Sequence, residues 1–133
     1  DLARVGGRYS DDWHVQHLAD PQSVVPESIM PRYAFLAATP LPKDDIGDHL
    51  KANRAVGVPY DDAMITNALA DLEAQADPEA DTSGLESRYA KISIRDFDGN
   101  PRVVSEMDAL VAYLQMLGTL VDLKAYQQNE NLR

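Results

Sequence analysis

Cysteine is absent from all 133 residues of the chain. This absence excludes disulfides, thiolate metal sites and thioether attachment of a haem within the chain, and it removes the usual clue to the redox compartment. Long apolar runs are also absent, because no stretch approaches the roughly 18 residues that a transmembrane helix requires. The chain begins with Asp1 rather than Met, and we therefore expect it to be a piece of a longer protein.

Basic residues are scarce. The chain has 12 Lys and Arg against 22 Asp and Glu, which gives a formal net charge of -10. Without Lys/Arg clusters a nucleic-acid partner is excluded, whereas an acidic surface permits an encounter with a basic protein. Hydrophobic residues make up 44% of the chain, which is typical of a folded protein. We predict a single domain over residues 1–133.

Residues 20–31 form the most constrained stretch, since prolines stand at positions 21, 26 and 31. Each proline fixes φ and removes a backbone donor, so this stretch is predicted to be a stiff loop rather than a helix. The loop ends at Met30. A thioether there is either an adaptable core filler or a soft metal ligand, and the residues alone leave both alternatives open.

Spacing of apolar residues and capping signals predict a mainly α domain with proline-rich loops. Ser10 followed by two aspartates predicts the first helix start, and Ser105 with Asp108 resembles a capping box. The last helix should close at Gly118. The predicted helices cover residues 11–19, 43–55, 61–76 and the segment from the Ser105 cap to Leu117.

Between these helices the pattern is less regular. Ile92 and Ile94 alternate with polar residues as in a strand, so at most one short hairpin is predicted at residues 89–97. Residues 77–84 are acidic and small, and we predict a mobile loop there. Residues 122–133 form a polar tail that is expected to fray.

Two histidines are candidate metal ligands. His14 and His17 lie three residues apart on one face of the first predicted helix. Without a clear third ligand, an accidental surface pair is the favoured interpretation, and a divalent-metal site is the weaker alternative.

Aspartates stand close together at other places in the sequence, but none of these places is predicted to be a catalytic or calcium site. The adjacent acids at 44–45 and 61–62 stand at predicted helix starts, where they favour the helix dipole rather than acid–base catalysis. Asp96, Asp98 and Asn100 alternate as in a calcium loop, yet Met107 occupies the expected closing position, so we predict no calcium site.

Several segments, taken in chain order, resemble the mono-haem subunit II of the cbb-type cytochrome c oxidases, which is a class I c-type cytochrome. The matching segments are Asp1-Leu2, Gly7-Arg8-Tyr9-Ser10, Asp12-Trp13-His14, His17-Leu18, Asp20-Pro21, Val24-Val25-Pro26-Glu27-Ser28-Ile29-Met30-Pro31, Phe97-Asp98-Gly99-Asn100, Met107-Asp108-Ala109-Leu110-Val111-Ala112-Tyr113-Leu114-Gln115 and Glu130-Asn131-Leu132-Arg133. The proline-to-methionine loop alone would indicate only a c-type cytochrome. Its combination with the Gly-Arg-Tyr-Ser and Trp-His segments points to this subunit.

The resemblance implies a set of haem contacts. Met30 would be the distal axial ligand of a haem c, and Pro26 would shape the loop that carries it. Arg8, Tyr9 and Trp13 would contact the haem, with the guanidinium and the indole N–H donating to its propionates. For Arg8 and Trp13, a surface cation and a core indole are equally good interpretations.

The chain departs from that family in one respect, because it has no Cys-x-x-Cys-His segment. In the family this segment precedes the position of Asp1, together with an N-terminal helix and a membrane anchor. We therefore expect an incomplete cytochrome c-like domain that binds no haem covalently, with a family-specific helical insert at residues 43–95. The missing N-terminal helix would cover the face of Leu110 and Leu114.

The function implied by the resemblance is electron transfer without an active site in this chain. The intact subunit would lie at the periplasmic face of the bacterial inner membrane, with the catalytic haem-copper subunit and the di-haem c subunit as partners. The alternative is an α-helical interaction module that uses residues 64–72 and 110–117 as contact faces. Self-association of the fragment is a further expectation.

Overall fold

The computed structural model describes residues 2–120, and within this range it contains α-helices and short 3₁₀-helices but no β-strand. The prediction of a mainly α fold is thereby confirmed. The hairpin predicted at residues 89–97 is wrong. Gln75 binds this segment instead, since its Nε2 donates to Ser93 O at 3.2 Å and its carbonyl accepts from the Arg95 N–H at 3.0 Å.

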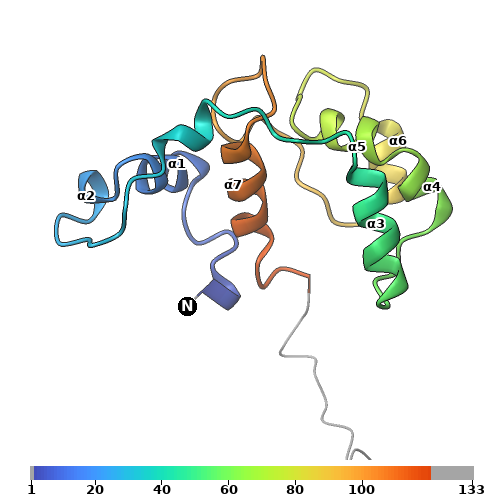
Figure 1. Cartoon of the computed structure of the whole chain (residues 1–133), viewed down its shortest axis with the longest axis horizontal. Coiled ribbons are helices and arrows are strands. Elements are labelled where there is room, and N and C mark those ends of the chain that lie inside the picture. The colour runs from blue at the N-terminus through green and yellow to red at the C-terminus, as the bar shows by residue number, and fades with distance from the viewer. Residues whose placement is uncertain (1, 121–133) are drawn as a thin grey trace, which may run out of the picture.

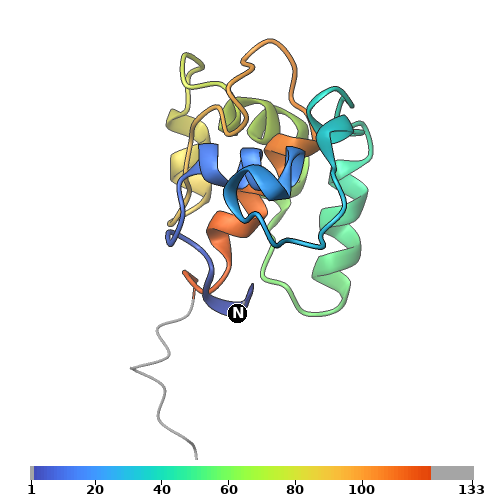
Figure 2. The same ribbon diagram turned by 90° about the vertical axis from the view of Figure 1, so that its left-hand side faces the viewer.

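The core lies where three helical elements meet. These are α1 (Asp11–Ala19), the 3₁₀-helix η2 (Ala34–Ala37) and α7 (Glu106–Met116), which pack on one another. The buried cluster consists of Leu18, Phe97, Met107 and Val111. Figure 2 shows α1 lying in front of α7, so residues from opposite ends of the chain form one core.

Two of the helices with a side-chain N-cap, α1 and α7, were predicted from the serine that caps each of them. α1 begins after Ser10, whose Oγ accepts the Trp13 N–H at 3.1 Å, and it spans the predicted residues. α7 begins with the predicted capping box, in which Ser105 and Asp108 bind each other's backbone. Gly118 follows with φ of 79°, a left-handed conformation that favours glycine.

The stretch 20–31 is not all loop. Pro21 starts a short helix, α2 (Pro21–Val24), because proline is tolerated at the first helical position, where the missing N–H costs no hydrogen bond. The prediction of a helix-free segment was therefore wrong over its first residues. From Val25 to Pro31 the chain is a loop, as predicted.

The insert forms its own helical lobe. It contains α3 (Ile46–Ala55), α4 (Asp62–Thr66), α5 (Ala68–Gln75) and α6 (Ser83–Arg88), and its helices contact one another. Figure 1 shows this lobe on one side of α7, with α1 and α2 on the other side. The segment that leads into the lobe is held near the start of α7, because the Leu41 N–H donates to Val104 O at 2.9 Å.

Three predictions in the insert need correction. The helix expected at residues 43–55 begins only at Ile46. The single helix expected at residues 61–76 is interrupted at Asn67, whose φ and ψ are −97° and 7° and whose Nδ2 donates to Ala63 O at 2.8 Å. A side chain that binds the preceding turn in this way competes with helix continuation. The predicted mobile loop at residues 77–84 also ends early, because α6 begins at Ser83.

Leu110 and Leu114 on α7 are half-buried and pack against the core cluster, and whether an N-terminal helix covers the rest of their surface stays a prediction. Tyr113 and Met116 on the same helix are exposed, at 54% and 36%. The predicted polar tail at residues 122–133 lies outside the described residues. None of the helices within residues 2–120 has the length and apolar character needed to cross a membrane.

Candidate functional site

The loop that carries Met30 begins with a tight turn. The Ser28 N–H donates to Val25 O at 2.9 Å, which places Pro26 at the second position of a four-residue turn. Proline is favoured there because its fixed φ matches the turn. Pro26 therefore restricts the backbone at the start of this loop.

Met30 itself is half-buried and packs against the buried cluster of α1 and α7. Its N–H donates to Ser28 Oγ at 3.2 Å, so its backbone is fixed as well as its side chain. The adjacent Ile29 is fully exposed, and Phe35 is 59% exposed. Exposed large apolar side chains therefore stand both before and after Met30 in the sequence.

These residues fit one axial side of a haem. A thioether is a soft donor suited to haem iron, and uncovered apolar side chains suit a large apolar macrocycle. The chain supplies no thiol for covalent attachment, since it contains no cysteine. Within these residues the donor chemistry for one side of the iron is present, and the chemistry for attaching the haem is not.

Tyr9, just before α1, and Trp13, on α1, lie together in an aromatic stack. The Tyr9 and Trp13 rings are 4.0 Å apart with an interplanar angle of 17°, and Trp13 stacks on His17 at 4.7 Å and 10°. Arg8 precedes the stack in sequence, but its exposed guanidinium forms no hydrogen bond or ion pair with residues 2–120. The structure thus brings two of the three predicted haem contacts, Tyr9 and Trp13, together, and their contact with a haem stays a prediction.

His14 is not the surface residue that the sequence suggested. It is 3% exposed and its Nε2 has no hydrogen-bond partner among the described residues, while its ring meets Trp13 edge-on at 5.4 Å. Burial lowers the pKa of His14, and the charge of Asp11 opposes this shift. The interpretation as an accidental surface pair with His17 was therefore wrong, because side-chain packing on α1 buries one of the two rings.

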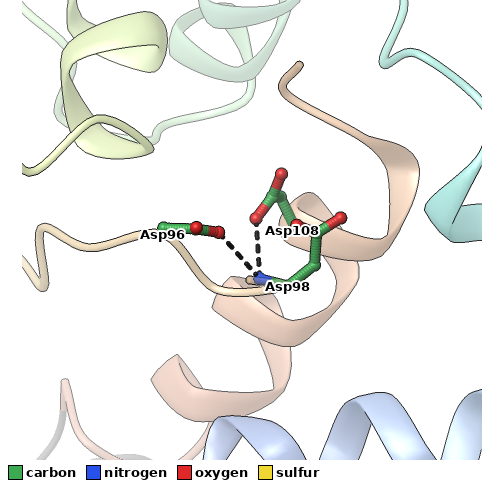
Figure 3. Close-up of side chains that lie close together, drawn as sticks. All are labelled: Asp96, Asp98 and Asp108. Carbon is green, nitrogen blue, oxygen red and sulfur yellow. Dashed lines mark hydrogen bonds between the residues drawn. The ribbon is translucent and has the colours of Figure 1, made fainter. Parts of the chain in front are cut away.

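Three aspartates form the one group within residues 2–120 in which three potential metal-ligating side chains meet. Oxygens of Asp96, Asp98 and Asp108 lie within 4.8 Å of one another (Figure 3). The group does not include His14 and His17, so nothing in this range completes a metal site for the two histidines. Asp108 comes from α7, and Asn100 contacts the group through its backbone N–H, which donates to Asp96 Oδ1 at 3.2 Å and to Asp98 Oδ1 at 2.8 Å.

Backbone donors occupy these carboxylates. Asp108 Oδ1 accepts the N–H groups of Phe97 and Asp98 at 3.1 and 3.0 Å, and Oδ2 accepts the Ser105 N–H at 3.0 Å. Asp96 Oδ1 likewise accepts the Gly99 N–H at 2.8 Å. The pKa of Asp108 lies above its usual value because the carboxyl group is buried, and the hydrogen bond from the Ser105 N–H opposes this shift. The group therefore holds the turn against the start of α7, a structural role.

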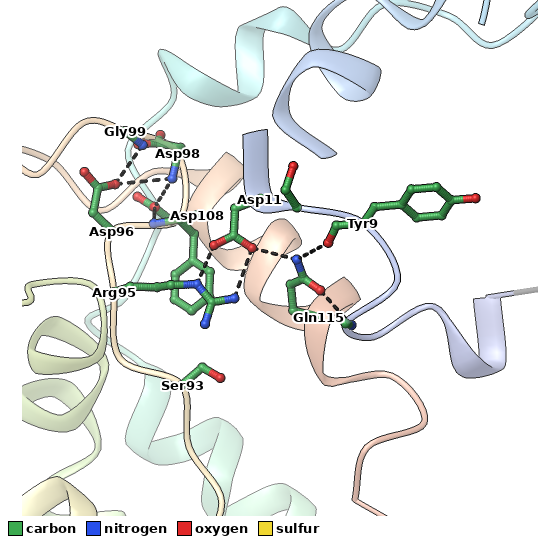
Figure 4. Close-up of polar contacts among 12 residues, drawn as sticks. Tyr9, Asp11, Ser93, Arg95, Asp96, Asp98, Gly99, Asp108 and Gln115 are labelled. Carbon is green, nitrogen blue, oxygen red and sulfur yellow. Dashed lines mark hydrogen bonds and ion pairs between the residues drawn. The ribbon is translucent and has the colours of Figure 1, made fainter. Parts of the chain in front are cut away.

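A second polar network, which the sequence did not reveal, connects the two ends of the domain (Figure 4). Arg95 forms two hydrogen bonds to the carboxylate of Asp11, and Gln115 Nε2 donates to Asp11 Oδ1 at 2.7 Å. Gln115 also binds the first segment, since its Oε1 accepts the Gly7 N–H at 2.9 Å. Hydrogen bonding to Arg95 lowers the pKa of Asp11. The partners are too distant in sequence for any local pattern to have indicated them.

Helices α1 and α7 packed on one core, with a methionine-bearing loop against that core, define an all-α, cytochrome c-like domain. A family model described as cytochrome c oxidase, mono-heme subunit/FixO, matches residues 1–121, and the chain belongs to this family. No curated protein matches the chain. Membership makes the chain part of the mono-haem subunit of an oxidase complex that transfers electrons.

Proposed function

We propose that this chain is the part of the mono-haem subunit that supplies the distal axial ligand, Met30, to a haem c. The observation that carries the proposal is the double fixation of Met30, by the Ser28 hydroxyl and by packing on the core, in a chain of this family. A ligand residue has to be held before the iron binds if the coordination geometry is to be reproducible. A methionine that only fills the core would not need a hydrogen bond that fixes its backbone.

The bound haem would supply one-electron chemistry at its iron, and the chain's own residues would hold it in place. Met30 offers a thioether, which favours the reduced iron and so raises the reduction potential. The Trp13 indole N–H and the Arg8 guanidinium would donate to the propionate carboxylates, with Tyr9 supporting Trp13 through the ring stack. Because the chain has no cysteine, it would bind no haem covalently by itself.

The family supports membership of a multi-subunit oxidase. Within it we propose that the catalytic haem-copper subunit and the di-haem c subunit are the partners of the intact protein. We further propose a location on the periplasmic face of the bacterial inner membrane.

The test is to express the chain with an N-terminal Cys-x-x-Cys-His segment in a host that matures c-type cytochromes. Met30→Ala is expected to abolish the far-red absorption of thioether-bound ferric iron and to lower the reduction potential. Met64→Ala, which removes the same side chain from α4 in the insert, is the matched control and should change neither. An unchanged spectrum and potential in Met30→Ala would show that Met30 is not the ligand.

A second candidate function is a protein-interaction module, and one observation favours it. An open hollow of about 570 Å³ lies between the insert and α7, and its walls include Met64, Leu72, Tyr113 and Met116. The proposed contact faces thus border the same hollow. The face on α7 is formed by Tyr113 and Met116 rather than by Leu110 and Leu114.

A further inference from the structure

The backbone of Met30 is held on its N-terminal side by Ser28. The Met30 N–H donates to Ser28 Oγ at 3.2 Å, a local bond from backbone to serine side chain. Ser28 is itself held, because its carbonyl accepts Gln22 Nε2 at 3.2 Å and its N–H donates to Val25 O at 2.9 Å. A chain of hydrogen bonds therefore runs from α2 to Met30.

Different contacts hold the C-terminal side of Met30. Pro31 follows it and restricts Met30 to extended backbone conformations. The Tyr33 N–H then donates to Leu18 O on α1 at 2.8 Å, and Arg32 Nε lies 3.1 Å from Asp20 Oδ1. The short segment between Ser28 and Tyr33 is thus anchored to α2 at one end and to α1 at the other.

We propose that Ser28 is a positioning residue for the Met30 sulfur and that Gln22 holds Ser28 in place. The inference rests on the proposed role of Met30 as an axial ligand. Ser28 acts through the Met30 N–H, which restricts φ of Met30 and so the direction in which the side chain leaves the backbone. This N–H has no other hydrogen-bond partner within residues 2–120. Alanine at position 28 would remove this bond and leave φ of Met30 less restricted, while the backbone hydrogen bonds at both ends of the segment would remain.

The chain without haem provides the first test. In Ser28→Ala, exchange of the Met30 amide hydrogen should be about fivefold faster, the change expected from the loss of one net hydrogen bond. Ser28→Thr keeps a hydroxyl and should restore slow exchange. Gln22→Ala, at an exposed position, should give an intermediate rate. The control is Ser87→Ala, which removes a serine hydroxyl bonded to Gly84 O at 2.7 Å in the insert and should leave the Met30 amide unchanged.

The haem-bearing protein provides the second test, in which imidazole competes with the methionine for the oxidised iron. Ser28→Ala should let imidazole bind at about fivefold lower concentration, with Ser28→Thr and Ser87→Ala behaving as the parent protein. The positioning role is overturned if Ser28→Ala titrates like the parent while Met30→Ala binds imidazole more tightly. If Met30→Ala also titrates like the parent, the ligand proposal fails, and this inference fails with it.

Discussion

Gln115 on α7 donates a hydrogen bond to Asp11 on α1, with Nε2 and Oδ1 2.7 Å apart. The two residues are separated by 104 positions in sequence, and Arg95 reaches the same carboxylate from the end of the insert. Asp11 therefore joins α1, the insert and α7. The fold that positions Met30 depends on this junction, because Met30 packs on the core formed by α1 and α7.

Removing the carboxylate at this junction should destabilise the domain. Asp11→Asn is expected to lower the free energy of unfolding by about 1–3 kcal/mol, since it leaves the charge of Arg95 without its partner. Urea denaturation followed by circular dichroism measures the change. Asp12→Asn is the matched control, because Asp12 is the next residue in the first turn of α1 and is exposed. Equal losses in both variants would show that only the helix dipole was affected.

The same contact between Asp11 and Arg95 predicts that the free energy of unfolding falls at acid pH. Arg95 lowers the pKa of Asp11 in the folded protein below its usual 3.8. The folded state therefore binds the proton less readily than the unfolded state, and the stability that this pair contributes is present above about pH 4. It is lost as the pH falls toward the lowered pKa. Unfolding measured between pH 5 and pH 2 should show a shallower decline in Asp11→Asn than in the parent chain.

His14 predicts a second pH dependence, at higher pH. Burial lowers its pKa in the folded state below 6.5, so the unfolded chain binds the proton more readily. The groups that influence His14 are Asp11, which opposes this shift, and His17, which adds to it. The free energy of unfolding should thus fall as the pH decreases below about 6.5.

Substitution separates this effect from general acid denaturation. His14→Leu should flatten the dependence between pH 7 and pH 5, because the buried titrating ring is gone. His49→Leu, at an exposed position on α3, should keep the slope of the parent chain. A slope that persists in His14→Leu would assign the effect to another group.

Gly6 allows the first segment to approach α7 closely. A Cβ atom there would lie 2.4 Å from Gln115 O and 2.6 Å from Leu117 O, both backbone atoms that cannot move independently. Gly6→Ala should therefore lower the free energy of unfolding by about 2–3 kcal/mol. Gly47→Ala is the control within a helix, where the nearest atom would be 3.4 Å away. Chemical denaturation should show that this variant gains about 0.5–1 kcal/mol.

The open face of α7 predicts self-association. Tyr113 and Met116 are exposed apolar residues beside the hollow between α7 and the insert. If two copies pair through this face, light scattering after size exclusion should give a mass above that of one chain, and Met116→Asp should return it to one chain. Val103→Asp places the same charge at an exposed apolar residue in the loop before α7 and should leave the mass unchanged. A parent chain that is monomeric at high concentration contradicts this prediction.

Local signals predicted what depends on neighbours in sequence. The caps at Ser10 and Ser105 act within three residues, so both helix starts could be predicted without knowledge of the fold. The Ser28 hydroxyl beside the Met30 N–H is equally local. A serine two residues before the methionine was therefore a signal available in the sequence.

Other features depended on which segments pack together. A histidine on a helix gives no local sign of burial, and only the packing of the folded domain shows that His14 is enclosed. Asp108 could be predicted as a cap, but its bonds to Phe97 and Asp98 require the preceding turn to fold back on α7. The broken helix at Asn67 is an intermediate case, because a side chain overrode a regular apolar pattern.

The sequence by itself determined the helical class, the two helices capped by serine, the proline-restricted loop and the presence of one soft donor on it. These properties follow from φ restrictions, capping and apolar spacing, which act over a few residues. Only the tertiary structure decided that the loop packs on the core and that Asp11, Arg95 and Gln115 meet. Such contacts join residues far apart along the chain, and their energies depend on burial and distance, which no short stretch of sequence specifies.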